Sequence, residues 1–577
     1  LQRWPVPPAH RGDAAQQRSR FAFGADGADP GPVDLVTESL VKLVVQVSHR
    51  WEHSGDVAVS HPEPGVWKDL IQSIDKQLLG IWQGLVSDAQ AETVLEDVGF
   101  GQPQKVLRLL TYLSGALGAD QIGSKGRQRL EKLIPLVLKT VGEASRPERV
   151  LSRIFDLLKS IGGRISYFAL LLENPDALTH LIRLTESSPW IASFLALHPV
   201  LLDELLDPRT LYIPPGIEQI KKDLKRRMRS RPADDLEDQI EQMCVFKEVN
   251  VLRVAAADVT GALPLMRVSD HLSAIAETVL AEVVTLAYEH LLARHGRPRC
   301  ELNGKRGDSG FAVVAYGKLG GLELGYGSDL DLVFLHSGTS AKTRGGQQAI
   351  DSAQFFNRLG QRVIHILTSH TRAGKLYDID MRLRPSGGAG VLVSHAEGFR
   401  EYQQKQAWTW EHQALIKARP ILGDPLLSDH FNQTRNVVLA RQREEHKLKQ
   451  EVIHMRSRMR QELLKPQRGM FDLKHDTGGM VDIEFLVQYL VLLKSHEFPA
   501  LLQWTDNVRL IQTLITTGAI DEYIAHILKH AYLIYRAAAH QASLQENPAK
   551  APEEKFSHLR QRVESIWNSF LGWPHLS

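Results

Sequence analysis

Two aspartates, Asp329 and Asp331, lie two residues apart where an apolar run, residues 330–335, begins. A run of this length and composition predicts a buried strand, in which successive side chains alternate between the two faces. The two carboxylates therefore share one face of a rigid strand, where they repel each other unless a cation lies between them. Because oxygen ligands suit Mg²⁺ held together with substrate phosphates, this spacing predicts a magnesium site.

A glycine-rich turn precedes this strand. Residues 311–316 are apolar and β-branched enough for another buried strand, and five glycines separate them from Asp329. Glycine allows positive φ and a close approach of the backbone to a ligand, and backbone N–H groups in such a turn can hold phosphates. We therefore expect Gly320, Gly321 and the neighbouring Ser328 to contact a nucleotide. A solvated turn explains an isolated Asp-x-Asp, but it does not explain five glycines beside two buried strands.

A third carboxylate is expected from residues 376–384, LYDIDMRLR, which predict an alternating strand with Asp378, Asp380, Arg382 and Arg384 on one face. Three carboxylates beside a glycine turn indicate metal-dependent nucleotidyl transfer, in which two Mg²⁺ ions about 3.5–4 Å apart bridge the carboxylates and a triphosphate. We select Asp380, because Asp378 lies at the entry of the strand, although the choice between them stays open. Arg382 and Arg384 are expected to neutralise phosphate charge, with salt bridges to nearby acids as the alternative.

Amphipathic helices are predicted on both sides of this region. We divide the chain into four parts. Residues 1–34 are a disordered or linker tail, and residues 35–299 are a helical region. Residues 300–429 form a catalytic α/β domain, and residues 430–577 form a C-terminal helical bundle with a regulatory or substrate-binding role. In the last part, a glycine turn feeds a helix that carries Asp482 and Glu484 near its N-terminus. We expect this helix to pack against the catalytic face, with its acids near the two arginines or the metals.

Composition narrows the class of protein. Of the 577 residues, 43% are hydrophobic and 24% are charged, which is typical of a soluble globular protein, and the net charge of +2 gives no global nucleic-acid signature. Two cysteines far apart in the sequence suit a reducing compartment. No apolar run approaches the ~20 residues of a membrane span. We therefore expect a cytoplasmic protein without a membrane or nucleic-acid partner.

Four motifs in order carry a family resemblance: YGKLGGLELGYGSDLDLVFLH, DMRLRPSGGAG, AWTWEHQALIKAR and GGMVDIEFLVQYLVL. From about residue 70 to the C-terminus, the chain resembles the bifunctional glutamine synthetase adenylyltransferase/adenylyl-removing enzymes. This resemblance implies an α+β fold: a polymerase-β-type nucleotidyltransferase domain with a small mixed sheet, flanked by large all-α regions. The family's usual spacing from its glycines to Asp-x-Asp is longer than the spacing from Gly320 and Gly321 to Asp329.

The same resemblance implies a function. The family carries two catalytic modules, of which the N-terminal one removes AMP by phosphorolysis and the C-terminal one attaches it from ATP. WTWEHQALIKAR resembles the attaching half, with His412 where the removing half carries Arg, so we expect this chain to be the C-terminal portion. Trp408 and Trp410 of this motif are candidates for stacking on adenine, although such tryptophans are more often core and rim residues. A tyrosine of glutamine synthetase is the implied acceptor, and glutamine and the PII signal protein are the implied regulators.

Two other functions compete with this interpretation. A nucleotidyltransferase acting on RNA should carry a stronger basic patch, and one acting on a small molecule has no need of several hundred flanking helical residues. A non-catalytic regulatory binding module is the second alternative, and the intact Asp329, Asp331 and Asp380 argue against it.

Overall fold

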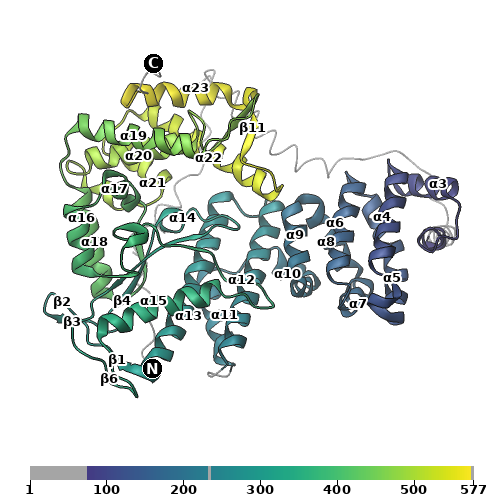
Figure 1. Ribbon diagram of the computed structural model, residues 1–577. Helices are drawn as coiled ribbons and strands as arrows, with labels where there is room; N and C mark the ends of the chain where they lie inside the picture. The colour runs from purple at the N-terminus through teal and green to yellow at the C-terminus, as the bar shows by residue number, and fades with distance from the viewer. Residues whose placement is uncertain (1–74, 232–234, 573–577) are drawn as a thin grey trace, which may run out of the picture.

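The computed structural model describes residues 75–231 and 235–572, and it is mostly helical around one small mixed sheet (Figure 1). This confirms the predicted α+β class with large helical regions on both sides of the sheet. The predicted tail, residues 1–34, lies outside the described residues. The predicted division into four parts is not tested and stays a prediction.

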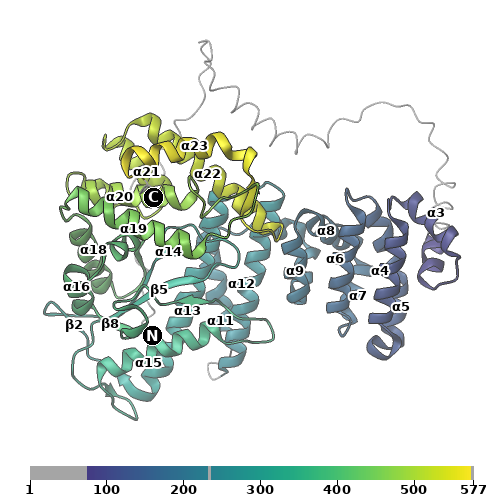
Figure 2. The same cartoon turned by 45° about the horizontal axis from the view of Figure 1, so that its top comes forward.

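An elongated arm of short helices leads from the N-terminal side toward the sheet, which the two views in Figures 1 and 2 show alike. Several of its helices begin at proline, whose missing N–H costs nothing in a first helical turn. The helices of this arm are α3 (Asp88–Val98), α4 (Pro103–Ala116), α5 (Ala119–Gly142), α6 (Pro147–Ser160), α7 (Ser166–Glu173), α8 (Pro175–Ser187), α9 (Pro189–Leu197), η2 (Pro199–Leu206) and α10 (Pro208–Leu211).

Three further helices join the arm to the sheet: α11 (Ile217–Arg229), α12 (Leu236–Val259) and α13 (Leu265–His295). Serine and aspartate favour the N-cap of a helix, so Ser269 and Asp270 predict a helix start there, but α13 begins at Leu265 and includes both residues. Ser269 is buried within the helix, where its hydroxyl accepts a hydrogen bond of 2.6 Å from Arg536.

By length and composition α13 could cross a membrane, contrary to the prediction that no run approaches a span, but 61% of its apolar window is buried inside the protein. A helix covered in this way is typical of a protein core.

The central sheet has the order β7-β5-β4-β9, with β8 also paired to β5. β4 is antiparallel to β5 and to β9, whereas β7 and β8 run parallel to β5, at its start and its end. The strands are β4 (Phe311–Ala315), β5 (Leu330–His336), β7 (Ile379–Asp380), β8 (Val393–His395) and β9 (Arg419–Gly423). Three two-stranded pairs lie outside it: β1 (Gly296–Arg297) with β6 (Arg344–Gly345), β2 (Glu301–Leu302) with β3 (Lys305–Arg306), and β10 (Met470–Asp472) with β11 (Lys550–Pro552).

Each face of the sheet belongs to a different hydrophobic core. Phe311, Val313, Leu330 and Leu332 pack into the core of the N-terminal helices. The alternate residues, Val314, Tyr316, Val333 and Leu335, pack into the core of the C-terminal helices. Asp331 has the strand parity of Val333 and Leu335, so it lies on the face that the C-terminal helices cover.

Helices α14 (Gly317–Gly320), α15 (Ser352–Thr368), η3 (Gly387–Ala389), α16 (Ala396–Lys405) and α17 (Thr409–Ile416) complete the sheet region. The C-terminal helices are α18 (Pro425–Leu439), α19 (Glu445–Leu463), α20 (Met480–Lys494), η4 (Pro499–Leu502), α21 (Asn507–Thr516), α22 (Glu522–Leu544) and α23 (Glu553–Phe570). In Figure 1, α19 to α23 gather above the sheet, coloured green to yellow, and α18 lies beside it. α18 runs across the predicted boundary between residues 429 and 430.

Two local predictions are wrong. The alternating strand expected over residues 376–384 is only β7, because the chain turns directly after Asp380 and Ser386 adopts a left-handed φ of 60°. The local pattern of residues 397–419 predicts a single helix, but the segment is divided into α16 and α17, and its last residue already belongs to β9. Strand pairing with β4 overrides the local helical pattern at this last position.

Candidate active site

The sheet brings the three predicted carboxylates to one edge. β5 and β7 are parallel neighbours in which Asp331 lies opposite Asp380, and Asp329 directly precedes β5. The pKa of Asp331 is raised from 3.8 to about 6, first by burial and then by the charges of Asp329 and Asp380. Lys318 and Arg382 act in the opposite direction without cancelling this shift. The site therefore holds negative charge that the protein's own cations leave only partly neutralised.

The strand register distinguishes the two candidates for the third carboxylate. Asp380 lies opposite Asp331, whereas the side chain of Asp378 is 66% exposed and pairs with Lys375 at 2.6 Å. Asp378 contributes its backbone carbonyl instead, which accepts a hydrogen bond of 2.9 Å from the N–H of Leu330. This arrangement favours Asp380 over Asp378.

The donor set fits a divalent cation in its chemistry, but the carboxylate of Asp380 is held by Arg382 and not by a shared site with the other two. Asp329 and Asp331 supply only carboxylate oxygens, the ligands that Mg²⁺ prefers, and their mutual repulsion is what a cation relieves. The carboxylate of Asp380 is turned onto Arg382, which donates to it from its backbone N–H at 2.8 Å and from its guanidinium at 2.5 Å. Within residues 75–231 and 235–572, no three acidic, histidine or cysteine side chains converge closely enough to hold a metal ion. Asp380 thus has to leave Arg382 if it is to join the other two.

The raised pKa of Asp331 leads to a prediction about stability. Asp331 has a pKa of about 6 in the folded chain and 3.8 as the ordinary value, so the folded state loses stability as pH rises through this interval. Without divalent cations, Asp331→Asn should raise the free energy of unfolding by about 1–3 kcal/mol above pH 7. The gain should disappear below about pH 4, where Asp331 is protonated in both states. Thermal unfolding in EDTA across this range measures it, and an Asn variant less stable than the parent at pH 8 would contradict it.

The glycine turn, residues 317–321, packs tightly against its surroundings. A Cβ on Gly317 would lie 2.1 Å from Oδ2 of Asp331, and one on Gly320 would lie 1.9 Å from the carbonyl oxygen of Lys417. The N–H groups of Gly320 and Gly321 donate to the carbonyls of Tyr316 and Gly317. Close packing is therefore a sufficient reason for glycine at these positions, and the predicted phosphate contacts of Gly320 and Gly321 stay a prediction.

Lys318 is a site residue that the sequence interpretation missed. Its ammonium donates to the hydroxyl of Ser328 at 3.3 Å, and that hydroxyl also accepts from the N–H of Gly325. Burial lowers the pKa of Lys318, whereas Asp329 and Asp331 raise it. The sequence did contain a signal for Lys318, because this lysine lies inside the glycine turn, directly before Leu319 and Gly320.

The two predicted arginines differ in their surroundings. Arg382 is 83% exposed and pairs only with Asp380 among the described ion pairs, so its guanidinium can reach a ligand. Arg384 donates instead to the carbonyls of Met381, Gly388 and Gly390, which closes the loop after β7. The expected common face for both arginines is therefore wrong, because the backbone turns between them.

The remaining predicted residues, Trp410 and His412, lie in α17. His412 is buried, donates through Nε2 to the carbonyl of Gln403 at 3.0 Å, and has its pKa lowered to about 4 by burial. It is thus a neutral imidazole that joins α17 to α16. Trp410 is partly exposed, and Trp408 is more exposed at 70%. No described contact joins these side chains to the carboxylates, so their roles remain predictions.

The described acids of α20 pair with cations other than Arg382 and Arg384, and the expectation that they lie near the two arginines or the metals stays a prediction. Asp482 forms a fully buried pair with Arg456 at 2.6 Å, and Glu484 lies 3.4 Å from the ammonium of Lys417. The same ammonium contacts Glu323, which lies two residues after the glycine turn. α20 therefore does reach the catalytic segment, through Lys417.

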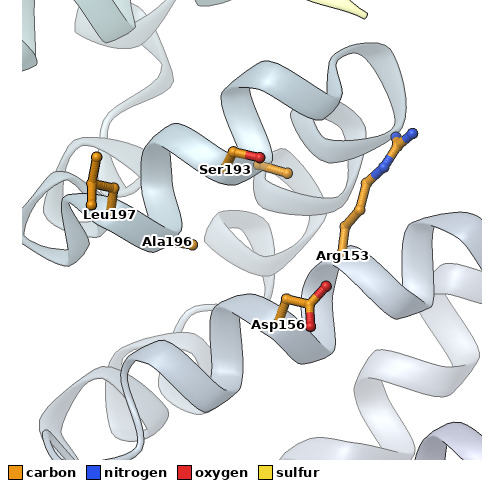
Figure 3. A pocket seen from close by; sticks show the side chains of 6 residues that line it. Arg153, Asp156, Ser193, Ala196 and Leu197 are labelled. Atoms are coloured by element: carbon orange, nitrogen blue, oxygen red, sulfur yellow. The ribbon is translucent and has the colours of Figure 1, made fainter. Parts of the chain in front are cut away.

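A pocket far from these residues in the sequence lies between α6 and α9 (Figure 3). Its lining includes Arg153, Asp156 and the exposed Leu197. Arg153 donates to the carbonyl of Thr185, and the lining holds one carboxylate without a second acid beside it. Its chemistry does not resemble that of the carboxylate edge.

Comparison with known proteins confirms the resemblance carried by the four motifs. Residues 178–434 match the family described as glutamate-ammonia ligase adenylyltransferase. The chain is similar to proteins named bifunctional glutamine synthetase adenylyltransferase/adenylyl-removing enzyme: 45% identical over 495 residues to that of Thioalkalivibrio sulfidiphilus, covering 86% of this chain and 51% of the relative. It is 42% identical over 551 residues to the protein of that name from Nitrosococcus oceani, covering 93% of this chain and 57% of the relative. It is 43% identical over 504 residues to the one from Pseudomonas putida, covering 85% of this chain and 52% of the relative. The chain thus spans about half the length of the curated relatives it matches.

Proposed function

We propose that this chain, whose residues 178–434 match the glutamate-ammonia ligase adenylyltransferase family, transfers AMP from ATP to a tyrosine hydroxyl of glutamine synthetase, with release of pyrophosphate. The observation that carries this proposal is the carboxylate edge: Asp329 and Asp331 on the side of β5 that faces the C-terminal helices, with Asp380 opposite. This edge lies against the glycine turn, where a Cβ on Gly317 would lie 2.1 Å from Oδ2 of Asp331.

Asp329, Asp331 and Asp380 are the residues that would hold Mg²⁺, which supplies charge neutralisation at the phosphoryl oxygens when it is bound. Lys318 and the exposed Arg382 are cations at the same edge, and in this proposal they bind the negative charge of the triphosphate. Ser328 orients the ammonium of Lys318 through its hydroxyl. The acceptor tyrosine then approaches a triphosphate that this chain holds between carboxylates and cations.

The direction of the reaction is part of the proposal. The relatives are named for both adding and removing AMP, and the chain spans about half of their length. WTWEHQALIKAR resembles the adding half, so we assign addition to this chain and removal to the part of the relatives that it does not match. On the basis of the family resemblance, we also propose that glutamine and the PII signal protein regulate the reaction and that the chain is located in the cytoplasm.

The test uses ATP labelled in its α-phosphate, Mg²⁺, the full chain and glutamine synthetase. We expect label on glutamine synthetase, and none on a matched preparation whose acceptor tyrosine is replaced by phenylalanine. Label that fails to appear on glutamine synthetase over a range of glutamine concentrations, with and without PII protein, would refute the proposal. Phosphate-dependent release of ADP from modified glutamine synthetase, as fast as the forward reaction, would show that the assigned direction is wrong.

A further inference from the structure

Five side chains from separate segments meet in one polar cluster between the glycine turn and the C-terminal helices. We call this cluster the buried clamp; its members are Glu323, Lys417, Glu484, Asn507 and Tyr532. Glu323 follows the glycine turn, and Lys417 lies between α17 and β9. The other three belong to α20, α21 and α22.

Lys417 is the centre of the buried clamp. Its ammonium lies 2.5 Å from Oε2 of Glu323 and 3.4 Å from Oε1 of Glu484. Asn507 closes the cluster, since its amide donates to both carboxylates at 3.3 Å. Tyr532 completes it by donating from its hydroxyl to Oε1 of Glu484 at 3.3 Å. The bonds therefore link the turn to three different C-terminal helices.

The clamp is buried and charged at the same time. Lys417 and Glu323 are only 7% and 8% exposed, and Asn507 is fully buried. Burial by itself would lower the pKa of Lys417, but Glu323 and Glu484 raise it above its ordinary value. Burial likewise would raise the pKa of Glu323, but Lys417 lowers it. Both side chains consequently keep their charges at neutral pH.

The C-terminal side also contacts the backbone of the glycine turn. The carbonyl of Gly320 accepts hydrogen bonds from Thr505 at 2.8 Å and from Arg419 at 3.0 Å. Arg419 donates as well to the carbonyl of Leu319, and it pairs with Glu277 of α13. The carbonyl oxygen of Lys417 fills the space where Gly320 would carry a side chain. The end of the turn is thus held at its backbone, with little freedom to shift.

Stability alone is a poor reason for such a cluster, because apolar residues of similar volume often stabilise a core as well as buried ions do. Directional bonds differ from apolar contacts in fixing distances between the groups they join. Here the distances that they fix are those between the glycine turn and the C-terminal helices. The opposite end of the same turn, Gly317, lies against Asp331.

We propose that Lys417 and Thr505 are positioning residues for AMP transfer, because they hold the glycine turn beside Asp331 and make its position depend on the docked C-terminal helices. This inference rests on the proposed function and deepens it, since it assigns to the C-terminal helices a part in building the nucleotide site.

Three variants of the full chain test this inference. Lys417→Met leaves two buried acids without a cation, so it is paired with Lys417→Met/Glu323→Gln/Glu484→Gln, which removes all three charges together. We expect the triple variant to recover most of the thermal stability lost by Lys417→Met, while kcat/KM for ATP stays about 100-fold below the parent. Thr505→Val removes one hydrogen bond to Gly320 from a similar shape, and it should lower kcat/KM about fivefold.

Arg253→Met/Glu204→Gln provides the matched control, because it removes a partly buried pair of 2.7 Å inside the N-terminal helices. Its kcat/KM for ATP should equal that of the parent. Amide hydrogen exchange gives a second readout: residues 317–323 should exchange faster in the Lys417 variants, and α6 should not change. A triple variant or a Thr505→Val variant with parental kcat/KM and parental exchange of the turn would overturn the inference, and Thr505→Val decides if the triple variant does not fold.

The two proposals fail in distinguishable ways. If the parent chain transfers no AMP, the proposed function fails, and the clamp is then judged by hydrogen exchange of the turn and by calorimetric titration with ATP and Mg²⁺. If the parent transfers AMP and the Lys417 and Thr505 variants do so equally well, the clamp inference alone fails.

Discussion

Replacing Asp331 with asparagine should lower the rate of AMP transfer by about 10²–10³-fold while the chain stays folded. Asp331 lies on β5 opposite Asp380, and its carboxylate packs against Gly317 of the glycine turn. An amide keeps the shape but removes the charge that attracts a divalent cation. Asp329→Asn should have a similar effect, because it supplies the other carboxylate that is not engaged by Arg382.

Asp378→Asn is the matched control for these variants. Asp378 is two residues from Asp380 in the same segment, but its carboxylate is exposed and pairs with Lys375. Its rate should stay within about twofold of the parent, as expected for a surface ion pair. Rates would be measured across Mg²⁺ concentrations together with thermal unfolding. An Asp331→Asn chain with a near-parental rate at limiting Mg²⁺ would remove Asp331 from the proposed metal site.

Gly317→Ala should lower the rate of transfer by about 100-fold, because it displaces the Asp331 carboxylate from its place beside the glycine turn. Gly317 has a φ of 53°, in the left-handed region that costs other residues about 1–2 kcal/mol. In addition, the new Cβ would lie 2.1 Å from Oδ2 of Asp331, so one of the two must move. The strain affects stability, and the displacement affects the reaction.

Gly325→Ala separates these effects from the mere loss of a glycine. It lies in the same connection between β4 and β5, but its Cβ would meet only the Ser328 hydroxyl at 3.7 Å, an ordinary contact distance. We expect it to transfer AMP at close to the parental rate. Equal rates for the two alanine variants, with both chains folded, would mean that the site does not depend on the fit between Gly317 and Asp331.

The sequence alone was sufficient to predict those features that depend only on residues close together in the chain. Side chains alternate along any strand, so the spacing of Asp329 and Asp331 predicted one face for both before any partner strand was known. Asp331 lies in β5 with the parity of Val333 and Leu335, and Asp329 directly precedes the strand. The continuous apolar runs of β4 and β5 predicted buried strands, because a strand covered on both faces needs apolar side chains on both. Apolar residues repeated at intervals of three and four predicted the helices. The four motifs carried the family resemblance, which the comparisons confirm.

Tertiary pairing decided what local pattern left open. Asp378 and Asp380 have the same parity, and only the register between β5 and β7 puts Asp380 opposite Asp331. The alternation expected for Arg382 and Arg384 ends where the chain turns after Asp380, so the two guanidinium groups meet different partners.

The clamp shows the same limit most clearly. Glu323 and Glu484 lie 94 and 67 residues from Lys417 in the sequence, and nothing in their local surroundings predicts a shared ion pair. A strand buried on both faces reads as one continuous apolar run, which conceals that each face packs against a different helical region. The sequence by itself therefore determined which residues could do chemistry and which face of their strand they share. Only the tertiary structure decided which helices cover that face, because contacts between distant segments depend on the packing of the whole chain.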